Sequence, residues 1–210
     1  FCHIGLGPSS RAPQAWYTQH ATDPADWGIA AFTVRSPRAA RELAARGFSY
    51  PLIVRGPDGD AEERIESVVA THDGADVEAF RRYLAGREVA VVTLTVTEGG
   101  YGLDADGDPD LADAAVQGDL IALRAGATTA STVLGRLILG LDARRRADAG
   151  SIAVVPCDNI PDNGAFVARG VTGFATQVDE GLSDWIRANV SFVSTSVDRI
   201  TPQVAEDEVV

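Results

Sequence analysis

The chain has 210 residues, of which 45% are hydrophobic and 23% are charged, and its formal net charge is -12. That length is enough for one sizeable hydrophobic core or two small ones. The negative charge repels phosphate backbones and anionic lipids, and no apolar run approaches the roughly 20 residues that span a bilayer, so we expect neither a nucleic-acid nor a membrane partner.

Short apolar strands alternate with helices along the first half of the chain. In chain order we expect a strand over residues 1–5, a helix over 11–20, a strand over 28–34, a helix over 37–46, strands over 52–54 and 65–71, a helix over 76–85 and a strand over 89–96. The turn-forming run Gly56-Pro57-Asp58-Gly59-Asp60 separates the two middle strands, which indicates a β-hairpin.

The second half follows the same pattern after one irregular segment. The acidic, turn-rich residues 102–118 are expected to form a surface loop, and Asn163-Gly164 is expected to be a turn. The remaining expected elements are a helix over 131–147, a strand over 152–155, helices over 165–178 and 183–189, and a strand over 190–197.

Uniformly apolar strands that alternate with helices are typical of a parallel sheet covered on both faces. The sequence therefore predicts an α/β fold of the doubly wound, Rossmann type. It would have a mainly parallel sheet, helices on both faces and an inserted β-hairpin.

Glycines and small polar residues follow several of the expected strands. In an open parallel sheet, ligands bind beyond the carboxyl ends of the strands. Gly5 and Gly7 follow the first strand and precede a helix, as in a turn that lets a dinucleotide pyrophosphate approach the backbone. The third glycine of that fingerprint is missing, and Arg11 lies nearby instead, so a simple glycine turn is the alternative interpretation.

The residues after the second strand bear on the choice of cofactor. An acidic residue there accepts the ribose 2′-hydroxyl of NAD, whereas an arginine accommodates the 2′-phosphate of NADP. Arg35 and Arg38 stand at this point, with no carboxylate before Glu42, which favours tolerance of NADP. The alternative is that both arginines are solvated residues at the start of a helix.

Asn159 and Asp198 are the candidates for chemistry. A side-chain amide such as that of Asn159 can donate hydrogen bonds to a developing alkoxide without adding a charge. Asp198 would orient a neighbouring acid or base, or cap the helix that follows it. No metal site is expected, because the three histidines are scattered and His3 is interpreted as a satisfied core histidine.

The chain contains no lysine, and all 18 of its cations are arginine. The absence of lysine excludes the P-loop enzymes and the Tyr-x-x-x-Lys pair of short-chain dehydrogenases. The sequence also lacks the Gly-x-Ser-x-Gly elbow, so a serine hydrolase is not expected. The absence of methionine and the apolar start at Phe1 lead us to expect part of a longer polypeptide or a trimmed sequence. Cys2 and Cys157 are expected to be small buried side chains in a reducing compartment.

Five motifs occur in an order that is similar to one enzyme family. They are Gly5-Leu6-Gly7 with Arg11-Ala12, Thr95-Val96-Thr97-Glu98-Gly99-Gly100-Tyr101, Cys157-Asp158-Asn159 with Asn163-Gly164, Asp184-Trp185-Ile186, and Val197-Asp198-Arg199-Ile200-Thr201-Pro202. Over essentially its whole length the chain resembles the polyol-specific long-chain dehydrogenases. That family includes mannitol 2-dehydrogenase and the fructuronate, tagaturonate and mannonate oxidoreductases.

The resemblance implies a dinucleotide-binding Rossmann domain over residues 1–202. Residues 203–210 would begin the connection to a C-terminal helical catalytic domain, absent from this chain, that carries the catalytic lysine. By resemblance, Asn159 forms half of an oxyanion hole, Asp198 supports the catalytic centre, and Thr97, Glu98 and Gly99 border the nicotinamide end of the cofactor. The family uses no metal.

The implied activity is a cytoplasmic, NAD(P)-dependent interconversion of a small polyol and a ketose, mannitol and fructose in the first instance. Reduction of a keto-uronate is one alternative, and a dinucleotide-binding module without catalysis is another. NAD is implied by the resemblance, whereas Arg35 and Arg38 favour NADP tolerance, and the oligomeric state is left open. Four departures from the family pattern lie around the cofactor cleft, at Ser9-Ser10, Pro13, Pro37-Arg38 and 193–196.

Overall fold

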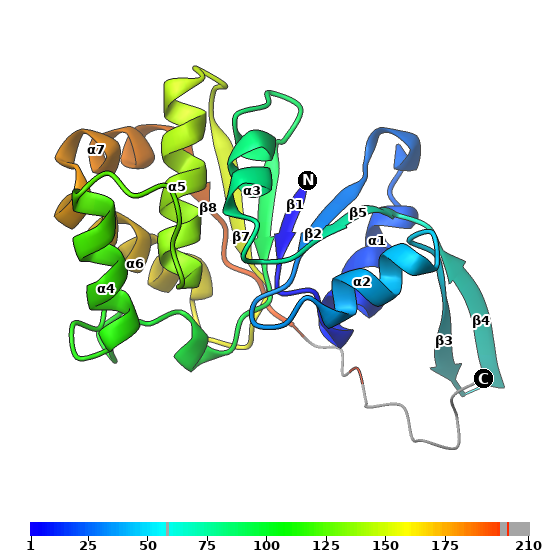
Figure 1. The fold of residues 1–210 in the computed structure, drawn as a ribbon. Coiled ribbons are helices and arrows are strands. Elements are labelled where there is room, and N and C mark those ends of the chain that lie inside the picture. The colour runs from blue at the N-terminus through cyan, green and yellow to red at the C-terminus, as the bar shows by residue number, and fades with distance from the viewer. Residues whose placement is uncertain (58, 198–200, 202–210) are drawn as a thin grey trace.

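The computed structural model describes residues 1–57, 59–197 and 201. Within them, six parallel strands form one sheet in the order β5-β2-β1-β6-β7-β8 (Figure 1). The strands are β1 (Cys2–Ile4), β2 (Ile29–Phe32), β5 (Val68–His72), β6 (Val91–Leu94), β7 (Ile152–Pro156) and β8 (Val190–Phe192). This is the strand order of a doubly wound Rossmann sheet, as the sequence predicts.

The position of β1 creates the place where a ligand can enter. The chain first adds β2 and β5 on one side of β1 and then returns to add β6, β7 and β8 on the other side. The connections that follow β1 and β6 therefore leave the sheet in opposite directions. Their divergence opens a crevice at the carboxyl edge of the sheet.

Helices cover both faces of the sheet. The smaller core contains residues of α1 and α2, and the larger core contains residues of α3 to α7. The helices are η1 (Ser10–Gln14), α1 (Ala15–Gln19), η2 (Pro24–Asp26), α2 (Arg38–Ala45), α3 (Val77–Leu84), η3 (Glu98–Gly100), α4 (Ala114–Arg124), α5 (Val133–Arg146), α6 (Asn163–Val178) and α7 (Glu180–Asn189). Within the described residues, no helix is both long and apolar enough to cross a membrane.

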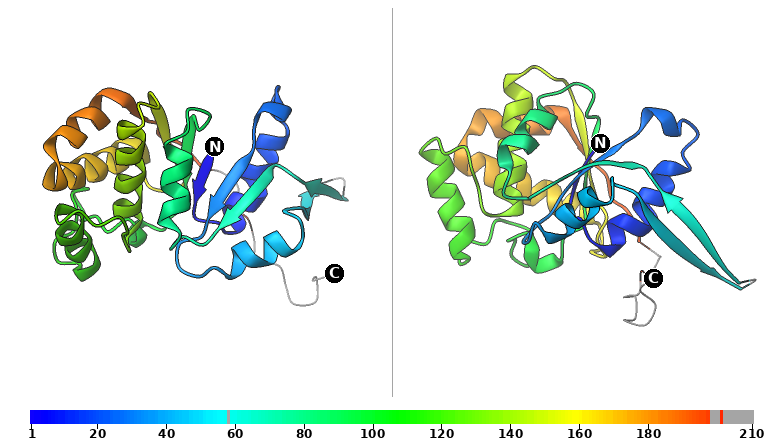
Figure 2. Two further views of the ribbon diagram at one scale, coloured as in Figure 1. Left: turned by 45° about the horizontal axis from the view of Figure 1, so that its top comes forward. Right: turned by 45° about the vertical axis from the view of Figure 1, so that its right-hand side comes forward.

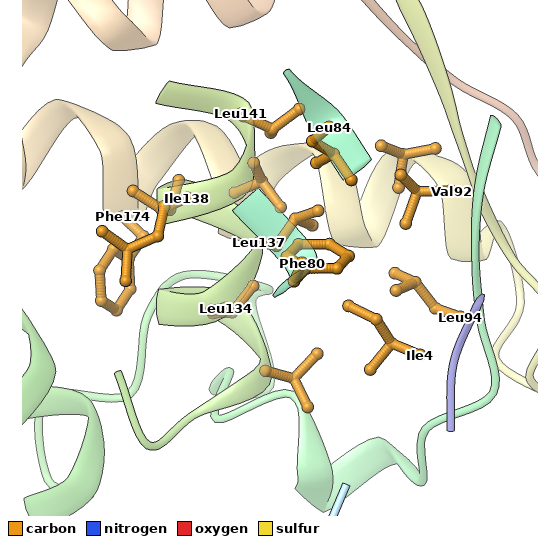
Figure 3. Close-up of a cluster of buried hydrophobic side chains, with 14 of the residues drawn as sticks. Ile4, Phe80, Leu84, Val92, Leu94, Leu134, Leu137, Ile138, Leu141 and Phe174 are labelled. Carbon is orange, nitrogen blue, oxygen red and sulfur yellow. The ribbon is translucent and has the colours of Figure 1, made fainter. Parts of the chain in front are cut away.

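The larger core joins the sheet to α3 and α5. Ile4 and Leu94 point from β1 and β6 toward Phe80 of α3 and Leu137 of α5 (Figure 3). All four side chains are at most 3% exposed. Because successive strand residues point to opposite faces, His3 faces away from this core.

The segment predicted to be a loop over 102–118 contains the start of α4, so that prediction is wrong from Ala114 onward. Acidic residues suggested a loop, yet one of them starts the helix. The Asp113 carboxylate accepts a hydrogen bond from the Ala115 N–H at 2.7 Å and so caps α4. Val116 and Leu120 then anchor α4 in the larger core.

The inserted hairpin is present, but its second strand differs from the prediction. β3 (Tyr50–Gly56) pairs with β4 (Gly59–Ile65), whereas most of the predicted strand over 65–71 is β5 of the main sheet. β4 was missed because it is mostly polar and exposed, without the alternation of a half-buried strand. The hairpin projects away from the six-stranded sheet (Figure 2).

The first helix and the last strand also differ from their predictions. The helix predicted over 11–20 begins as the wide-turn helix η1, and the strand predicted over 190–197 ends at Phe192. Beyond Phe192, the Thr195 N–H donates to the side chain of Asn163 instead of continuing a strand ladder.

Arg144 of α5 is a charged residue inside the protein, only 1% exposed. Its guanidinium nitrogens donate to five backbone carbonyls at 2.8–3.1 Å. Those carbonyls belong to Leu84, Gly86, Ala149, Gly150 and Ser151. One side chain thus ties the end of α3 to the turn that precedes β7.

We expect Arg144→Met to lower the free energy of unfolding by about 3 kcal/mol or more, because five carbonyls lose their donor. Arg146→Met is the control. That arginine is 73% exposed and pairs with Asp142, so its loss should change the free energy by about 0.5 kcal/mol. Urea unfolding of both variants measures the difference, and equal effects would contradict this role.

Candidate functional site

A crevice of about 480 Å³ lies at the carboxyl edge of the sheet, where the connections that follow β1 and β6 diverge. Its walls come from segments far apart in the sequence: the turn after β1, the end of β2, the loop after β6 and the start of α5. The lining residues that matter below are Gly5, Arg35, Thr95, Thr97, Gly99 and Thr132.

The turn after β1 accepts only glycine at its first position. Gly5 has a φ of +115°, and a Cβ there would lie 2.2 Å from the carbonyl oxygen of Thr95. Helical residues begin directly after Gly7, at Pro8, whose missing N–H is harmless at a helix start. A narrow glycine turn followed by the positive end of a helix is suited to hold an anion such as a pyrophosphate.

Arg11 supports this turn. Its Nε lies 3.4 Å from the Gly7 carbonyl oxygen, and its own carbonyl accepts a hydrogen bond from the Tyr50 hydroxyl at 2.6 Å. The turn is thereby tied to the first helix and to β3. The role predicted for Arg11 as a cofactor-binding residue stays a prediction.

The two arginines after β2 differ in their surroundings. Arg35 is exposed and lines the crevice. Arg38 is 83% exposed, and its Nε donates to a carboxylate oxygen of Glu42 at 2.6 Å, an ion pair along α2. Of these two arginines, Arg35 is therefore the one that lines the crevice, and Arg38 is paired within its own helix.

The wall opposite β2 is the start of α5, and the buried Asp119 holds it in shape. Asp119, on α4, is 6% exposed and accepts hydrogen bonds from the backbone N–H and the hydroxyl of both Ser131 and Thr132 at 2.6–3.1 Å. Its carboxylate occupies the positive end of the α5 dipole. Sequence reasoning missed Asp119, because the first five residues of its helix were interpreted as a loop and no element was predicted directly beyond them.

The loop after β6 brings the three residues predicted at the nicotinamide end together. Thr97 and Gly99 line the crevice, and Glu98 is the exposed first residue of η3 between them. The Gly100 N–H donates to the Thr97 carbonyl at 2.7 Å and closes this short turn.

Asn159 lies exposed in the loop after β7, where its amide is free of the core. Two buried residues hold that loop. The Tyr101 hydroxyl donates to the Asp158 carboxylate, and the Asn163 side-chain amide donates to the carbonyls of Pro156 and Asp158 at 3.2 and 3.1 Å. Burial and the neighbouring carboxylate raise the pKa of Tyr101, so the phenol remains a donor at neutral pH.

The turn predicted at Asn163-Gly164 is wrong, because both residues begin α6. Asn163 is 0% exposed, and its Oδ1 also accepts a hydrogen bond from the Thr195 N–H at 2.9 Å. Asn-Gly has a strong turn preference, but tertiary hydrogen bonds override it here. Asp198, the other candidate for chemistry, lies outside the described residues.

An apolar hollow of about 450 Å³ lies on the sheet face opposite the larger core, beside β6. Tyr17, Trp27, Val91 and Cys157 are among its lining residues. Burial raises the pKa of the Cys157 thiol to about 11, which leaves it protonated and unreactive at neutral pH. Thr95 borders both this hollow and the crevice.

The remaining predictions concern histidine, cysteine and metals. His3 is fully buried with both ring nitrogens hydrogen-bonded, which confirms a satisfied core histidine. Cys2 is buried, Cys157 is partly buried, and both are free thiols. Among the residues that the structure describes, no group of three histidine, cysteine or acidic side chains is arranged to hold a metal ion.

Comparison with known proteins assigns the family. The sequence matches the model of the mannitol dehydrogenase Rossmann domain over residues 1–209. The chain belongs to the mannitol dehydrogenase family. This confirms the resemblance seen in the sequence motifs.

Individual relatives support the family assignment. The polyol:NADP oxidoreductase of Gluconobacter oxydans is 33% identical over 98% of this chain and 43% of its own length. The mannitol 2-dehydrogenase of Cereibacter sphaeroides is 34% identical over 98% of the chain and 44% of its own length. The chain thus spans less than half the length of these relatives.

A solved structure shares the fold as well. The Pseudomonas fluorescens mannitol 2-dehydrogenase, in a ternary complex with NAD and D-mannitol, superposes with a TM-score of 0.88. The two sequences are 34% identical, and the match covers 98% of this chain and 43% of the mannitol 2-dehydrogenase chain.

We expect Gly5→Ala in this mannitol dehydrogenase domain to cost at least about 2 kcal/mol of unfolding free energy, because the methyl group meets backbone and the φ is left-handed. Gly118→Ala, in the exposed middle of α4 with open space around it, should instead stabilise by about 0.5–1 kcal/mol. Thermal or urea unfolding distinguishes them. Equal stability of Gly5→Ala and the parent would contradict the close approach of Thr95.

We expect Tyr101→Phe to lower the free energy of unfolding by about 1.5–3 kcal/mol, because a hydrogen bond to the Asp158 carboxylate is lost. It should also speed hydrogen exchange at the Ile160 N–H, which donates to the Asp158 side chain at 3.3 Å. In Tyr83→Phe, which loses a hydroxyl contact to His72 at 3.2 Å, exchange at Ile160 should be unchanged. Unchanged exchange in Tyr101→Phe would show that this phenol does not hold the loop.

Proposed function

We propose that this chain is the dinucleotide-binding domain of an NAD(P)-dependent oxidoreductase that interconverts a small polyol and a ketose. The observation that carries the proposal is the glycine turn at the crevice, where a Cβ at Gly5 would collide with Thr95. A turn that excludes every side chain, followed at once by a helix start, fits a pyrophosphate.

The cofactor is held in this proposal by three parts of the crevice. The Gly5–Gly7 turn and the helix start receive the pyrophosphate, Arg35 faces the ribose of the adenosine half, and Thr97, Glu98 and Gly99 border the nicotinamide. When bound, the nicotinamide supplies the acceptor or donor of a hydride. Thr97, Glu98 and Gly99 are exposed at this edge, where they would orient the ring.

The chain's own contribution to chemistry is Asn159. Its exposed amide donates to the oxygen of the alcohol as that oxygen gains negative charge, which lowers the barrier without adding a charge. Tyr101 and Asn163 keep the loop of Asn159 in place. Asp198 is proposed to support the same centre.

The general base is proposed to come from outside these residues. The chain has no lysine, and arginine stays protonated near neutrality. We therefore divide the protein into a dinucleotide-binding domain over 1–202 and a connection from 203 to a helical catalytic domain that carries the base. The apolar hollow beside β6 supports this division, because packing of a second domain there would bury it.

Mannitol and fructose are the proposed substrate pair, by similarity to the mannitol 2-dehydrogenases. A keto-uronate is the second candidate, because the D-mannonate oxidoreductase of Escherichia coli is 34% identical over 95% of this chain and 42% of its own length. The test is a titration of the natural full-length protein with NADH and NADPH, followed by nicotinamide fluorescence with fructose or fructuronate. Loss of the signal with one substrate identifies the activity; binding without turnover leaves a non-catalytic module, and no binding refutes the proposal.

Tolerance of NADP is proposed to depend on Arg35. We expect Arg35→Asp to weaken NADPH binding about tenfold or more, because a 2′-phosphate loses its cation and meets a like charge. NADH binding should change less than about threefold. Arg41→Asp makes the same change of charge at an exposed site on α2 and should weaken neither nucleotide selectively. Equal loss of both nucleotides in Arg35→Asp would assign this arginine no part in cofactor choice.

A further inference from the structure

His3, Thr93 and Thr95 form a polar cluster where β1 pairs with β6, next to the glycine turn. His3 of β1 is 0% exposed and lies opposite Thr93 in the strand register. Its Nδ1 is 2.8 Å from the Thr93 hydroxyl, and its Nε2 is 3.0 Å from the Thr95 hydroxyl. Burying an imidazole costs free energy that an apolar residue in a central strand would not cost.

The donor and the acceptor of each hydrogen bond in this cluster can be assigned. The Thr95 hydroxyl lies 2.7 Å from the Gly5 carbonyl oxygen, which can only accept. The one hydrogen of Thr95 is therefore used on Gly5, and Thr95 must accept from His3. Nε2 of His3 then carries the hydrogen, and Nδ1 accepts from the Thr93 hydroxyl.

This assignment requires a neutral imidazole. Desolvation by burial, the larger of two effects, lowers the pKa of His3 to about 4, against an opposing effect of the Gly5 backbone. At neutral pH the ring therefore has one donor and one acceptor. Every link from Thr93 through His3 and Thr95 to Gly5 then has its hydrogen.

The chain of hydrogen bonds ends at the residue that the cofactor must approach. The Gly5 carbonyl is held by Thr95. The hydroxyl of the buried Ser10 lies 3.0 Å from the Gly7 carbonyl oxygen and 3.4 Å from that of Gly5, so its one hydrogen is directed mainly at Gly7. Ser10 also accepts from the Gly7 N–H at 3.1 Å. The turn is thus held by Thr95 on the β6 side and by Ser10 on the helix side. If the Gly5 peptide group were free to rotate, its carbonyl would point at an incoming phosphate.

We propose that His3 is a positioning residue of the dinucleotide site, which acts through the Thr95 hydroxyl to hold the Gly5 carbonyl against β6 and keep the turn open to the pyrophosphate. The inference rests on the proposed function, because it takes the ligand to be a dinucleotide. In this scheme the Thr95 hydroxyl links His3 to the turn, so removal of either side chain has the same consequence.

The test compares variants that remove a link with variants that keep it. Thr95→Val and His3→Leu remove a link, whereas Thr95→Ser keeps the hydroxyl and His3→Gln keeps an N–H near the position of Nε2. Nicotinamide fluorescence on the natural full-length protein measures the Kd for NADH and NADPH. We expect about a tenfold rise in Kd for the first pair and less than about threefold for the second.

Thr71→Val separates positioning from general stability. Thr71 of β5 also donates its hydroxyl to a backbone carbonyl, that of Ala40, at 2.8 Å, but β2 separates its strand from β1 and the glycine turn. This variant should lose stability much as Thr95→Val does and keep the parent Kd. A matching rise in Kd for Thr71→Val would reduce the role of Thr95 to stability and overturn the proposal.

The tautomer of His3 is a second readout that does not depend on activity. ¹⁵N NMR of the imidazole should show hydrogen on Nε2 alone, in a ring that stays neutral as the pH falls to about 4. Hydrogen on Nδ1, or binding by His3→Leu as tight as in the parent, overturns the proposal. If the parent itself binds neither nucleotide, the proposed function falls first and this inference falls with it.

Discussion

The pairing of β1 with β6 is the contact on which the rest of this structure depends. It is the point where the chain changes the side on which it adds strands, so the connections diverge and leave a crevice. The same contact brings the Thr95 carbonyl so close to Gly5 that no side chain fits between them. The pairing of β1 with β6 therefore determines both where the crevice opens and why only glycine fits at the turn.

Buried polar groups support two walls of the crevice and the loop after β7. Asp119 holds the start of α5, Tyr101 and Asn163 hold the loop of Asn159, and the Thr95 hydroxyl holds the turn after β1. Buried polar groups are stable only when they are hydrogen-bonded, and these are. The exposed residues of the site, Asn159 among them, are thereby presented on a fixed frame.

Predictions made from the sequence hold where the signal is local and periodic. The apolar strands and the amphipathic helices were found, because burial imposes its period on the residues themselves. α4 and β4 were missed for the opposite reason. The acidic residues before α4 resemble a loop until Asp113 caps the helix. The polar residues of β4 carry no pattern because most of them are exposed.

By itself the sequence determined the class of fold, the order of most of its elements, the family, and the turn at Gly5 and Gly7. These follow from spacing and from residues that occur together along the chain. Only the tertiary structure decided which arginine lines the crevice, which strand pairs in the hairpin, and which buried residues support the site. Those outcomes depend on contacts between residues as far apart as His3 and Thr95, which are 92 positions apart. No local preference specifies such a pair, because the register of two distant strands is selected by the packing of the whole sheet.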